Sequence, residues 1–384
     1  MGPITMNLVN GSPIDLYAYP EEDMTEKAMA DMKDVNWVNK VGYPRLHMAV
    51  KSNMPSAVER LLLRNACCLL KDHQNNTAVR IAVEFGYTEI VKLFCSAGVD
   101  MDALEHTSTR NHDSLPLFMC AVDNSHLDVV KVLIEHGMDP SVKLPDGTSS
   151  LHLAAQCDFD MKMMRILINT GIDVNMQTRD KVTALGLASR SDNLVGMKLL
   201  LDKGADVNVQ DIDGNTPLHL ALLSGYKKNL QLLLEHGADM YAKSNSGASV
   251  LHSAAYTRVT CMATLIRYGV DLERRDTEGK TAFLHAVKYR NYDVVRLLMA
   301  TGVDMSVRDM YHNTAMHFAA NDGDSELIQA ILRSGVSVPE QNFDYKTPLQ
   351  LAVEAEGPIL EMFEKRGAWV NHQECQTVFR VAMG

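Results

Sequence analysis

Few stretches of this 384-residue chain combine residue types that could perform chemistry. The run Glu278-Gly279-Lys280-Thr281 has the residue order found at the end of a phosphate-binding loop, where glycine N–H groups and a lysine hold phosphates. Such a loop also needs a glycine five residues before Gly279, and that position is Arg274. We therefore interpret the run as a tight turn followed by a helix cap, and we expect no nucleotide or other cofactor.

The 14 histidines could in principle bind a metal or transfer protons, but their positions indicate another role. Five of them follow an apolar residue in the first turn of an expected helix, each time at the same place in a recurring segment. An imidazole at that place can hydrogen-bond to the neighbouring turn, so we expect a structural role and no metal site. These five are His47, His152, His219, His252 and His317.

The seven cysteines are scattered and odd in number, and no C-x-x-C or H-E-x-x-H motif occurs. The adjacent pair Cys67-Cys68 does not suit tetrahedral zinc. Reduced thiols predict a cytoplasmic protein, with the nucleus also possible. Most carboxylates recur in turns, where they are expected to bond to the backbone rather than to act as acid and base. The chain is therefore predicted not to be an enzyme.

The charge and hydropathy of the chain exclude further classes of function. The net charge of −11 argues against nucleic acid as the main partner, because phosphate contacts need clustered lysine and arginine. No apolar run reaches the 18 or so residues that span a bilayer, so we expect no membrane insertion.

The elements that would position any functional side chain are clearest in residues 211–245. Gly214 predicts a tight turn, because glycine accepts a positive φ without steric cost. Thr216 is suited to cap a helix that begins at Pro217. A second apolar helix is expected to end just before Gly237. Two such short helices are unstable alone in water, so the unit needs a neighbour on each side.

The neighbours are present as copies of the same segment. The apolar position of Leu218 recurs at intervals of 30 to 38 residues, and a small residue follows it three positions later each time. The recurrences are Leu46, Val79, Leu117, Leu151, Leu185, Leu218, Leu251, Phe283, Met316, Leu349 and Phe379.

The copies resemble the ankyrin repeat family, with its period of 33 residues and its T-P-L-H-x-A signature. The matching segments include Thr216-Pro217-Leu218-His219-Leu220-Ala221 and Gly204-Ala205-Asp206-Val207-Asn208. The resemblance implies an all-α repeat solenoid, in which each ankyrin repeat contributes a β-turn or hairpin and two antiparallel helices. About ten full repeats and a partial eleventh are expected.

Two regions follow from this organisation. Residues 1–33 are expected to form a mobile N-terminus and a capping helix, and residues 34–384 the repeat array. The widest interval holds extra residues at 104–114, which are either a functional loop or a tolerated surface insertion. The last repeat is incomplete, so either the chain is part of a longer product or its last helix serves as a lid.

The resemblance further implies a non-catalytic scaffold or adaptor that binds a partner protein or peptide in a concave groove. The alternative is the recognition arm of a larger protein, such as a channel, a toxin or a ubiquitin-ligase subunit. We expect a monomer.

The partner surface is predicted in the C-terminal half, where aromatic and basic residues fall in turns and at first-helix ends. Between Tyr256 and Arg296 there are eight basic and five acidic side chains, against the overall negative charge. Tyrosine and arginine are enriched at binding hot spots, so an acidic or amphipathic peptide is the expected ligand. The alternative is an ordinary solvated face. The predicted contact residues are Tyr256, Arg258, Lys280, Lys288, Tyr289, Arg290, Tyr311, Phe343 and Tyr345.

Overall fold

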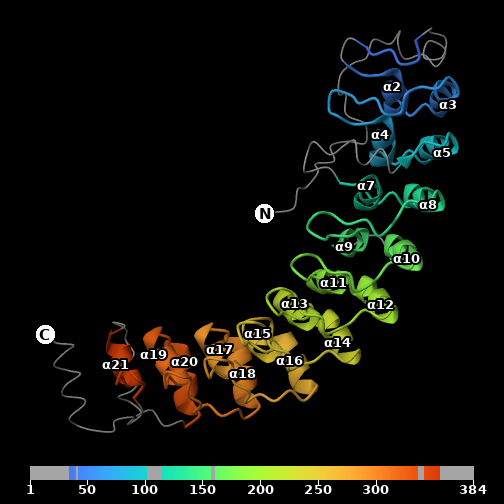
Figure 1. Ribbon diagram of the computed structural model, residues 1–384. Helices are drawn as coiled ribbons and strands as arrows, with labels where there is room; N and C mark the ends of the chain where they lie inside the picture. Colours follow the sequence, from blue (N-terminus) through green and yellow to red (C-terminus); the bar gives the residue numbers. More distant parts are fainter. Residues whose placement is uncertain (1–33, 40–41, 102–114, 157–160, 336–340, 355–384) are drawn as a thin grey trace, which may run out of the picture. The chain divides into compact units, whose positions relative to one another are not determined.

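The chain divides into two units, residues 1–144 (unit 1) and residues 145–384 (unit 2), and each unit is a stack of short helix pairs (Figure 1). The structure is a computed structural model, and it describes residues 34–39, 42–101, 115–156, 161–335 and 341–354. All the regular elements in these ranges are helices, apart from isolated single-residue bridges.

In unit 1 the first helices of successive repeats, α2, α4 and α7, pack side by side, and so do the second helices, α3, α5 and α8. Within each repeat the first helix also packs against the second. The bounds are α2 Arg45–Lys51, α3 Pro55–Leu63, α4 Ala78–Glu84, α5 Thr88–Ser96, α7 Leu117–Asp123 and α8 Leu127–Glu135.

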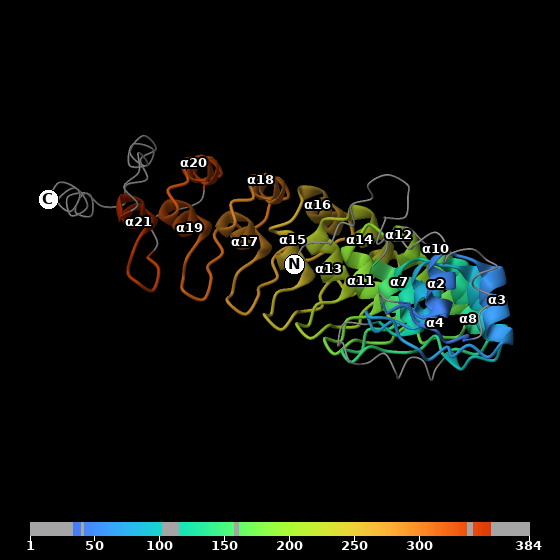
Figure 2. The same cartoon turned by 90° about the horizontal axis from the view of Figure 1, so that it is seen from above.

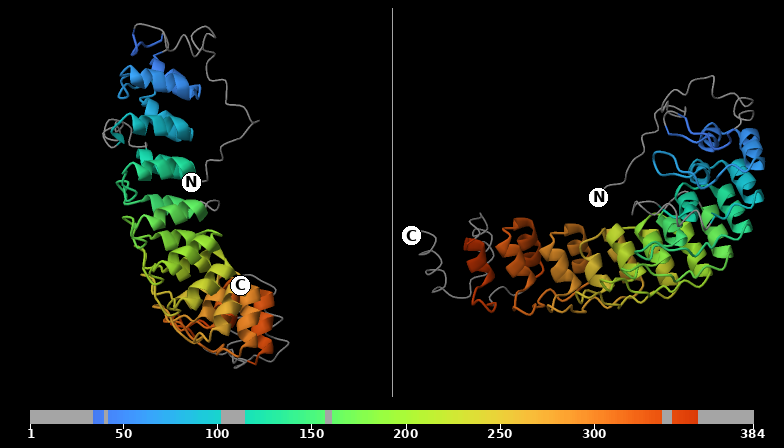
Figure 3. Two further views of the ribbon diagram at one scale, coloured as in Figure 1. Left: turned by 90° about the vertical axis from the view of Figure 1, so that its right-hand side faces the viewer. Right: turned by 45° about the horizontal axis from the view of Figure 1, so that its top comes forward.

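Unit 2 continues the same alternation of first and second helices. The first helices are α9 Ser150–Gln156, α11 Ala184–Arg190, α13 Pro217–Ser224, α15 Val250–Ala254, α17 Ala282–Lys288, α19 Ala315–Asn321 and α21 Pro348–Glu354. The second helices are α10 Met161–Asn169, α12 Leu194–Asp202, α14 Lys227–Glu235, α16 Val259–Arg267, α18 Tyr292–Ala300 and α20 Ser325–Arg333. Neighbouring first helices form one packed row from α9 to α21, and the second helices from α10 to α18 form another (Figure 3).

Local signals set the ends of these helices. Thr216 caps α13, and the His219 side chain returns a bond to the cap backbone, while Pro217 occupies the first helical position. The helix ends at Gly225 in the left-handed conformation (φ 74°). The second helix, α14, ends just before His236 and Gly237 (φ 83°), which confirms the expected boundaries.

A hairpin turn precedes each first helix of unit 2, and these hairpins project in a row from the same side of the helices (Figure 2). Within one hairpin the Asp211 carboxylate accepts bonds from the backbone of Asp213 and Asn215, at 3.0 and 2.7 Å. Successive hairpins are joined by single backbone bonds, such as that from Ile212 N to Asp180 O at 2.8 Å. The hairpins therefore form a connected edge, although none is long enough to make a named strand.

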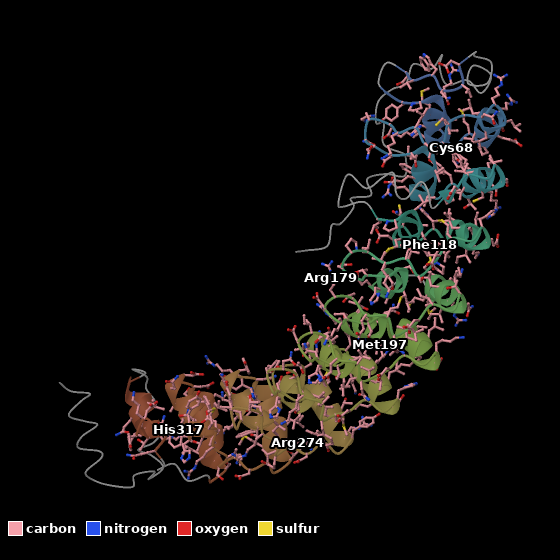
Figure 4. All side chains as sticks on the ribbon, in the orientation of Figure 1. Cys68, Phe118, Arg179, Met197, Arg274 and His317 are labelled. Atoms are coloured by element: carbon pink, nitrogen blue, oxygen red, sulfur yellow. The ribbon has the colours of Figure 1, made fainter. Side chains whose placement is uncertain are left out.

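The core of each unit lies between the helices of adjacent repeats. Phe118 of α7 and Met197 of α12 are fully buried (Figure 4), as are Leu218 and Leu233 of the repeat that best shows the pattern. Each repeat thus buries its apolar face against its neighbours, as expected for a linear repeat array.

The third repeat is shifted by one residue from the sequence-based register. Helix α7 begins at Leu117, whereas the Leu218 position is the second helical residue in other repeats. Ser125, which has a φ of 58°, corresponds to Gly225 only if Phe118 is the counterpart of Leu218. The assignment of Leu117 was wrong because the local sequence of Leu115-Pro116-Leu117 offers two apolar candidates, and only packing selects Phe118.

The expected all-α repeat solenoid is confirmed by the helix pairs and their hairpins. The capping helix within residues 1–33, the segment at 104–114 and the partial eleventh repeat lie outside the described residues. The boundary at residue 33 and the number of repeats therefore stay predictions.

Candidate functional site

Two exposed tyrosines from adjacent repeats form a pair at the C-terminal ends of first helices. Tyr256 follows the end of α15, and Tyr289 directly follows α17. Their ring centroids lie 5.0 Å apart, with an angle of 63° between the planes. This edge-to-face geometry is favourable for aromatic rings, and the side chains remain 39% and 54% exposed. The pair is therefore held in place yet accessible to a ligand.

A polar network beneath the rings supports them. Tyr289 lies parallel to the His285 ring at 6.1 Å, and His285 Nε2 lies 2.7 Å from the Asp276 carboxylate. The Tyr256 hydroxyl donates to Ser253 Oγ at 3.3 Å. Each ring is thus positioned by a neighbour from its own repeat as well as by the other ring.

The electrostatic environment sets the protonation states of His285 and Asp276. Burial lowers the pKa of His285, although Asp276 acts in the opposite direction. Burial on its own would raise the pKa of Asp276, but the hydrogen bonds from His285 and from the Lys280 backbone hold it below its usual value. The stable form near neutral pH is therefore an ionised Asp276 that accepts a bond from a neutral imidazole.

Lys280 was predicted as an exposed contact residue, and this prediction was wrong. Its side chain is only 4% exposed, its ammonium is paired with Glu278, and it lies 5.9 Å from the centre of the Phe318 ring. Burial on its own would lower the pKa of Lys280, but the bond to Glu278 raises it above its usual value. Lys280 is thus a charged part of the packing between two repeats.

Arg290 is also engaged within the protein. Its Nε lies 3.3 Å from the Asp324 carboxylate, and its guanidinium donates to the Tyr292 hydroxyl. Asp324 in turn caps α20 by accepting a bond from the Leu327 N–H at 3.1 Å. A ligand would have to compete with these partners for the charge of Arg290.

Two predicted cations remain available beside the tyrosine pair. Lys288, at the end of α17, is exposed and its Nζ lies 5.9 Å from the centre of the Tyr289 ring. Arg258 is exposed and lies against Gly225, whose lack of a side chain leaves room for it. Within the described ranges, neither cation forms an ion pair with a carboxylate. We call Tyr256, Arg258, Lys288 and Tyr289 the helix-end cluster.

The remaining predicted aromatics lie elsewhere. Tyr311 belongs to the hairpin before α19, and Phe343 and Tyr345 belong to the hairpin before α21. The hairpins adjoin the N-terminal ends of the first helices, and a seven-residue helix is about 10 Å long. The nine predicted residues therefore do not form one surface: the structure divides them between two ends of the first helices.

Sequence reasoning missed the residues that support the tyrosine pair. His285 and Asp276 lie nine positions apart, and nothing local links them. The available signal was that His285 stands where most other repeats of unit 2 carry an apolar residue such as Leu220 or Phe318.

Neither a metal centre nor a membrane span is found in the described part of the chain. No group of three or more histidine, cysteine, aspartate or glutamate side chains there is placed to hold a metal ion. None of the helices described has both the length and the apolar character needed to cross a bilayer.

Comparison with known proteins agrees with this architecture. A family model described as ankyrin repeats (3 copies) matches residues 21–105, 46–144, 117–211, 151–244 and 238–309 in overlapping windows. These windows cover well over half of the chain. The protein belongs to the ankyrin repeat family, whose members mediate protein–protein interaction and are typically non-enzymatic.

Individual relatives are similar over shorter stretches. The chain is 30% identical over 122 residues to the B-cell lymphoma 3 protein homolog of Mus musculus. The aligned stretch covers 31% of this chain and 26% of that protein. It is 24% identical over 134 residues to the putative ankyrin repeat protein L371 of Acanthamoeba polyphaga mimivirus. That aligned stretch covers 35% of this chain and 17% of that protein. The matches thus span 26% and 17% of the two relatives' lengths.

A solved structure shows the same fold. The crystal structure of the human ASB11 ankyrin repeat domain aligns with a TM-score of 0.52 and 28% sequence identity. The alignment covers 57% of this chain and 98% of that chain.

Proposed function

We propose that the chain is a non-catalytic adaptor and that unit 2 binds a short amphipathic segment of a partner protein on the helix-end cluster. The observation that carries this proposal is the exposed Tyr256–Tyr289 pair, which the His285–Asp276 bond supports from below. Ordered aromatic side chains contribute large contact area with little loss of side-chain entropy, which is why tyrosine is enriched at binding hot spots.

The charges beside the pair favour a carboxylate in the ligand. Lys280 and Arg290 are neutralised within the protein, so the positive potential comes from Arg258 and Lys288. An apolar side chain of the ligand would pack on the rings while an aspartate or glutamate reached one of these cations. The expected partner segment is thus amphipathic and mildly acidic rather than a long acidic run.

Cellular location and assembly are part of the same proposal. We infer a monomer. We also infer that it resides in the cytoplasm or nucleus, and this is supported by the buried free thiols of Cys120 and Cys261, whose pKa is raised by burial, so that they are poor nucleophiles at neutral pH.

The proposal can be tested with peptides selected from a displayed library of random dodecapeptides, using the full-length protein as bait. Replacing both tyrosines (Tyr256→Ala with Tyr289→Ala) should lower the affinity for the selected peptides at least about 30-fold, because a hot-spot aromatic side chain contributes about 2 kcal/mol or more to binding. Fluorescence anisotropy of labelled peptides measures the affinity.

Tyr268→Ala is the matched control, because Tyr268 is also 39% exposed but follows a second helix, α16. It should leave the affinity unchanged. Reversal of the charge by Lys288→Glu should lower the affinity for acidic peptides and reduce the dependence of that affinity on salt concentration. Selected peptides that bind the double variant as tightly as the natural protein would refute the proposed site.

A further inference from the structure

The second helices α10, α12 and α14 carry a group of basic side chains on their exposed face. In each helix the third, fourth and seventh residues are buried, such as Met197 and Leu200 of α12. The second and fifth residues therefore face away from the core. The exposed basic side chains at or next to these places, which we call the second-helix cluster, are Arg165, Lys198, Lys227 and Lys228.

In other repeats the basic side chains at these places are neutralised by ion pairs. Lys92, the fifth residue of α5, lies 2.8 Å from the carboxylate of Glu89, the second residue. The same pair of places forms an ion pair in α8. Arg296, the fifth residue of α18, is paired with Glu326 of the adjacent helix α20. The exposed faces of these helices thus contain both partners of each pair.

The second-helix cluster lacks such acidic partners. Where α5 has Glu89, α12 has Val195 and α14 has Lys228. Among the described residues, no carboxylate forms an ion pair with any of the four cluster side chains. Within their bounds, α10, α12 and α14 hold five basic and two acidic residues, or +3, whereas α18 and α20 hold two of each. This part of unit 2 is therefore locally positive.

The four cations are close enough to act together. Helix α10 packs against α12, and α12 packs against α14 (Figure 1). Arg165 and Lys198 are both the fifth residue of their helix, so they occupy equivalent places on neighbouring helices. Packed helices lie about 8–10 Å apart, which is about one Debye length at physiological salt. More distant acidic side chains are largely screened, so the overall charge of −11 does not cancel this surface.

Two apolar side chains are exposed beside the cations. Met161 begins α10 and Val195 is the second residue of α12, and each is 45% exposed. Surfaces that lie on a membrane combine cations, which contact anionic headgroups, with apolar side chains that enter the boundary with the acyl chains. A nucleic-acid backbone offers phosphates alone, so the apolar side chains favour a lipid surface.

The composition of the surface also argues against an acidic protein segment as the ligand. Three of the four cations are lysines, and α10, α12 and α14 contain no aromatic residue. Protein interfaces are depleted in lysine and enriched in arginine and aromatic residues. A lysine ammonium is a compact charge on a flexible stem, without the fixed geometry that makes arginine selective. Such charges suit an array of headgroups that can rearrange around them.

We propose that the second-helix cluster holds the protein against the surface of an anionic lipid membrane. The four cations contact the headgroups, and Met161 and Val195 enter the boundary between headgroups and acyl chains. Contact of this kind requires no helix that crosses the bilayer. The cluster shares no residue with the helix-end cluster, so peptide binding and membrane binding can be tested separately.

The test measures sedimentation of the full-length protein with vesicles of phosphatidylcholine, either pure or with one third phosphatidylserine. The protein should sediment with the phosphatidylserine vesicles only, and less of it should do so as the salt concentration rises. The decisive variant is Arg165→Glu with Lys198→Glu, because both side chains are exposed and neither contributes to the core. Its affinity for these vesicles should fall at least about tenfold.

Lys92→Glu with Lys131→Glu is the matched control, because it changes the net charge equally at the fifth residues of α5 and α8. It should leave vesicle binding unchanged. Tyr256→Ala with Tyr289→Ala should also bind vesicles normally, whereas the decisive variant should still bind the selected peptides. The two proposed sites can therefore fail independently.

Met161→Trp reports direct contact with the lipid, since its fluorescence should shift to shorter wavelength when phosphatidylserine vesicles are added. The proposal is overturned if the natural protein does not sediment with these vesicles, or if the decisive variant sediments equally well. An equal loss of binding in the matched control would also overturn it, because net charge alone would then explain the binding. So would an unchanged fluorescence of Met161→Trp, or binding of soluble polyglutamate but not of the vesicles.

Discussion

Lys181 shows how a single residue can oppose the local fold. It holds a φ of 57° at the hairpin position that Gly214 occupies in the next repeat. A β-carbon in this region crowds the backbone and costs about 1 kcal/mol relative to glycine. Sequence variation at this position should therefore change the free energy of unfolding.

We predict that Lys181→Gly raises the free energy of unfolding by about 0.5–1 kcal/mol, measured by urea denaturation. The reverse change at the neighbouring hairpin, Gly214→Ala, should destabilise the protein, because a β-carbon there would lie 2.7 Å from Asn245 N. A loss of stability in Lys181→Gly would contradict the strain argument.

At the scale of the element, histidines join several of the first helices to the next hairpin. The Nδ1 atom of His252 accepts a bond from the Ser249 N–H at 3.1 Å, and its Nε2 donates to Lys280 O at 2.9 Å. His152 connects Ser149 to Val182 in the same way. Only a neutral imidazole can accept at one nitrogen and donate at the other, so protonation breaks the cap. The bond to the neighbouring turn that was predicted for these histidines is confirmed for His47, His152, His252 and His317, whereas His219 makes only the cap bond to Thr216.

This arrangement predicts a pH dependence of stability. Burial lowers the pKa of His47, His219 and His252 below the usual 6.5. The unfolded chain then binds more protons than the folded one between the lowered pKa and 6.5, so the free energy of unfolding falls as the pH drops below about 6.5. Above that pH this contribution is fully present. Urea denaturation at about pH 7.5, 6.5 and 5.5 measures the slope.

The chain itself offers a non-titrating substitute. In α21, the first helix of the last described repeat, Gln350 occupies the position that histidine holds in the other repeats. Its Oε1 accepts a hydrogen bond from the Thr347 N–H at 2.8 Å. The variants His219→Gln and His252→Gln should therefore keep the helix cap and reduce the slope of stability with pH. An unchanged slope in the double variant would exclude these imidazoles as its source.

At the scale of the whole molecule, each described repeat packs against the repeats next to it in its unit. Met197 is fully buried in α12, which packs against α10, α11 and α14. We predict that Met197→Ala destabilises this region by about 2–5 kcal/mol. Hydrogen exchange measured by mass spectrometry should show lost protection in α10 to α14 and retained protection in α18 and α20.

Leu298→Ala is the matched core variant near the helix-end cluster, because Leu298 is equally buried in α18, which packs against α17. It should weaken peptide binding to the helix-end cluster, whereas Met197→Ala should not. Uniform loss of protection across unit 2 in either variant would show that the repeats unfold as one cooperative block.

The sequence determined the repeat and its internal boundaries because these depend on interactions within a few residues. Thr216 caps the helix that begins at Pro217, and Gly237 follows the end of the second helix, as expected from local chemistry. The buried histidines were also predictable, because they recur at one place in the repeat and the next hairpin lies beside that place.

Only the tertiary structure decided which of the predicted contact residues are available. Lys280 is covered by Phe318 of the next repeat, and Arg290 is paired with Asp324, 34 positions further along the chain. Tyr311 and Tyr289 belong to opposite ends of the first helices, although both follow the same sequence criteria. The physical reason is that burial and ion pairing are set by neighbours across the stack, whose side chains vary from repeat to repeat while the backbone pattern stays the same.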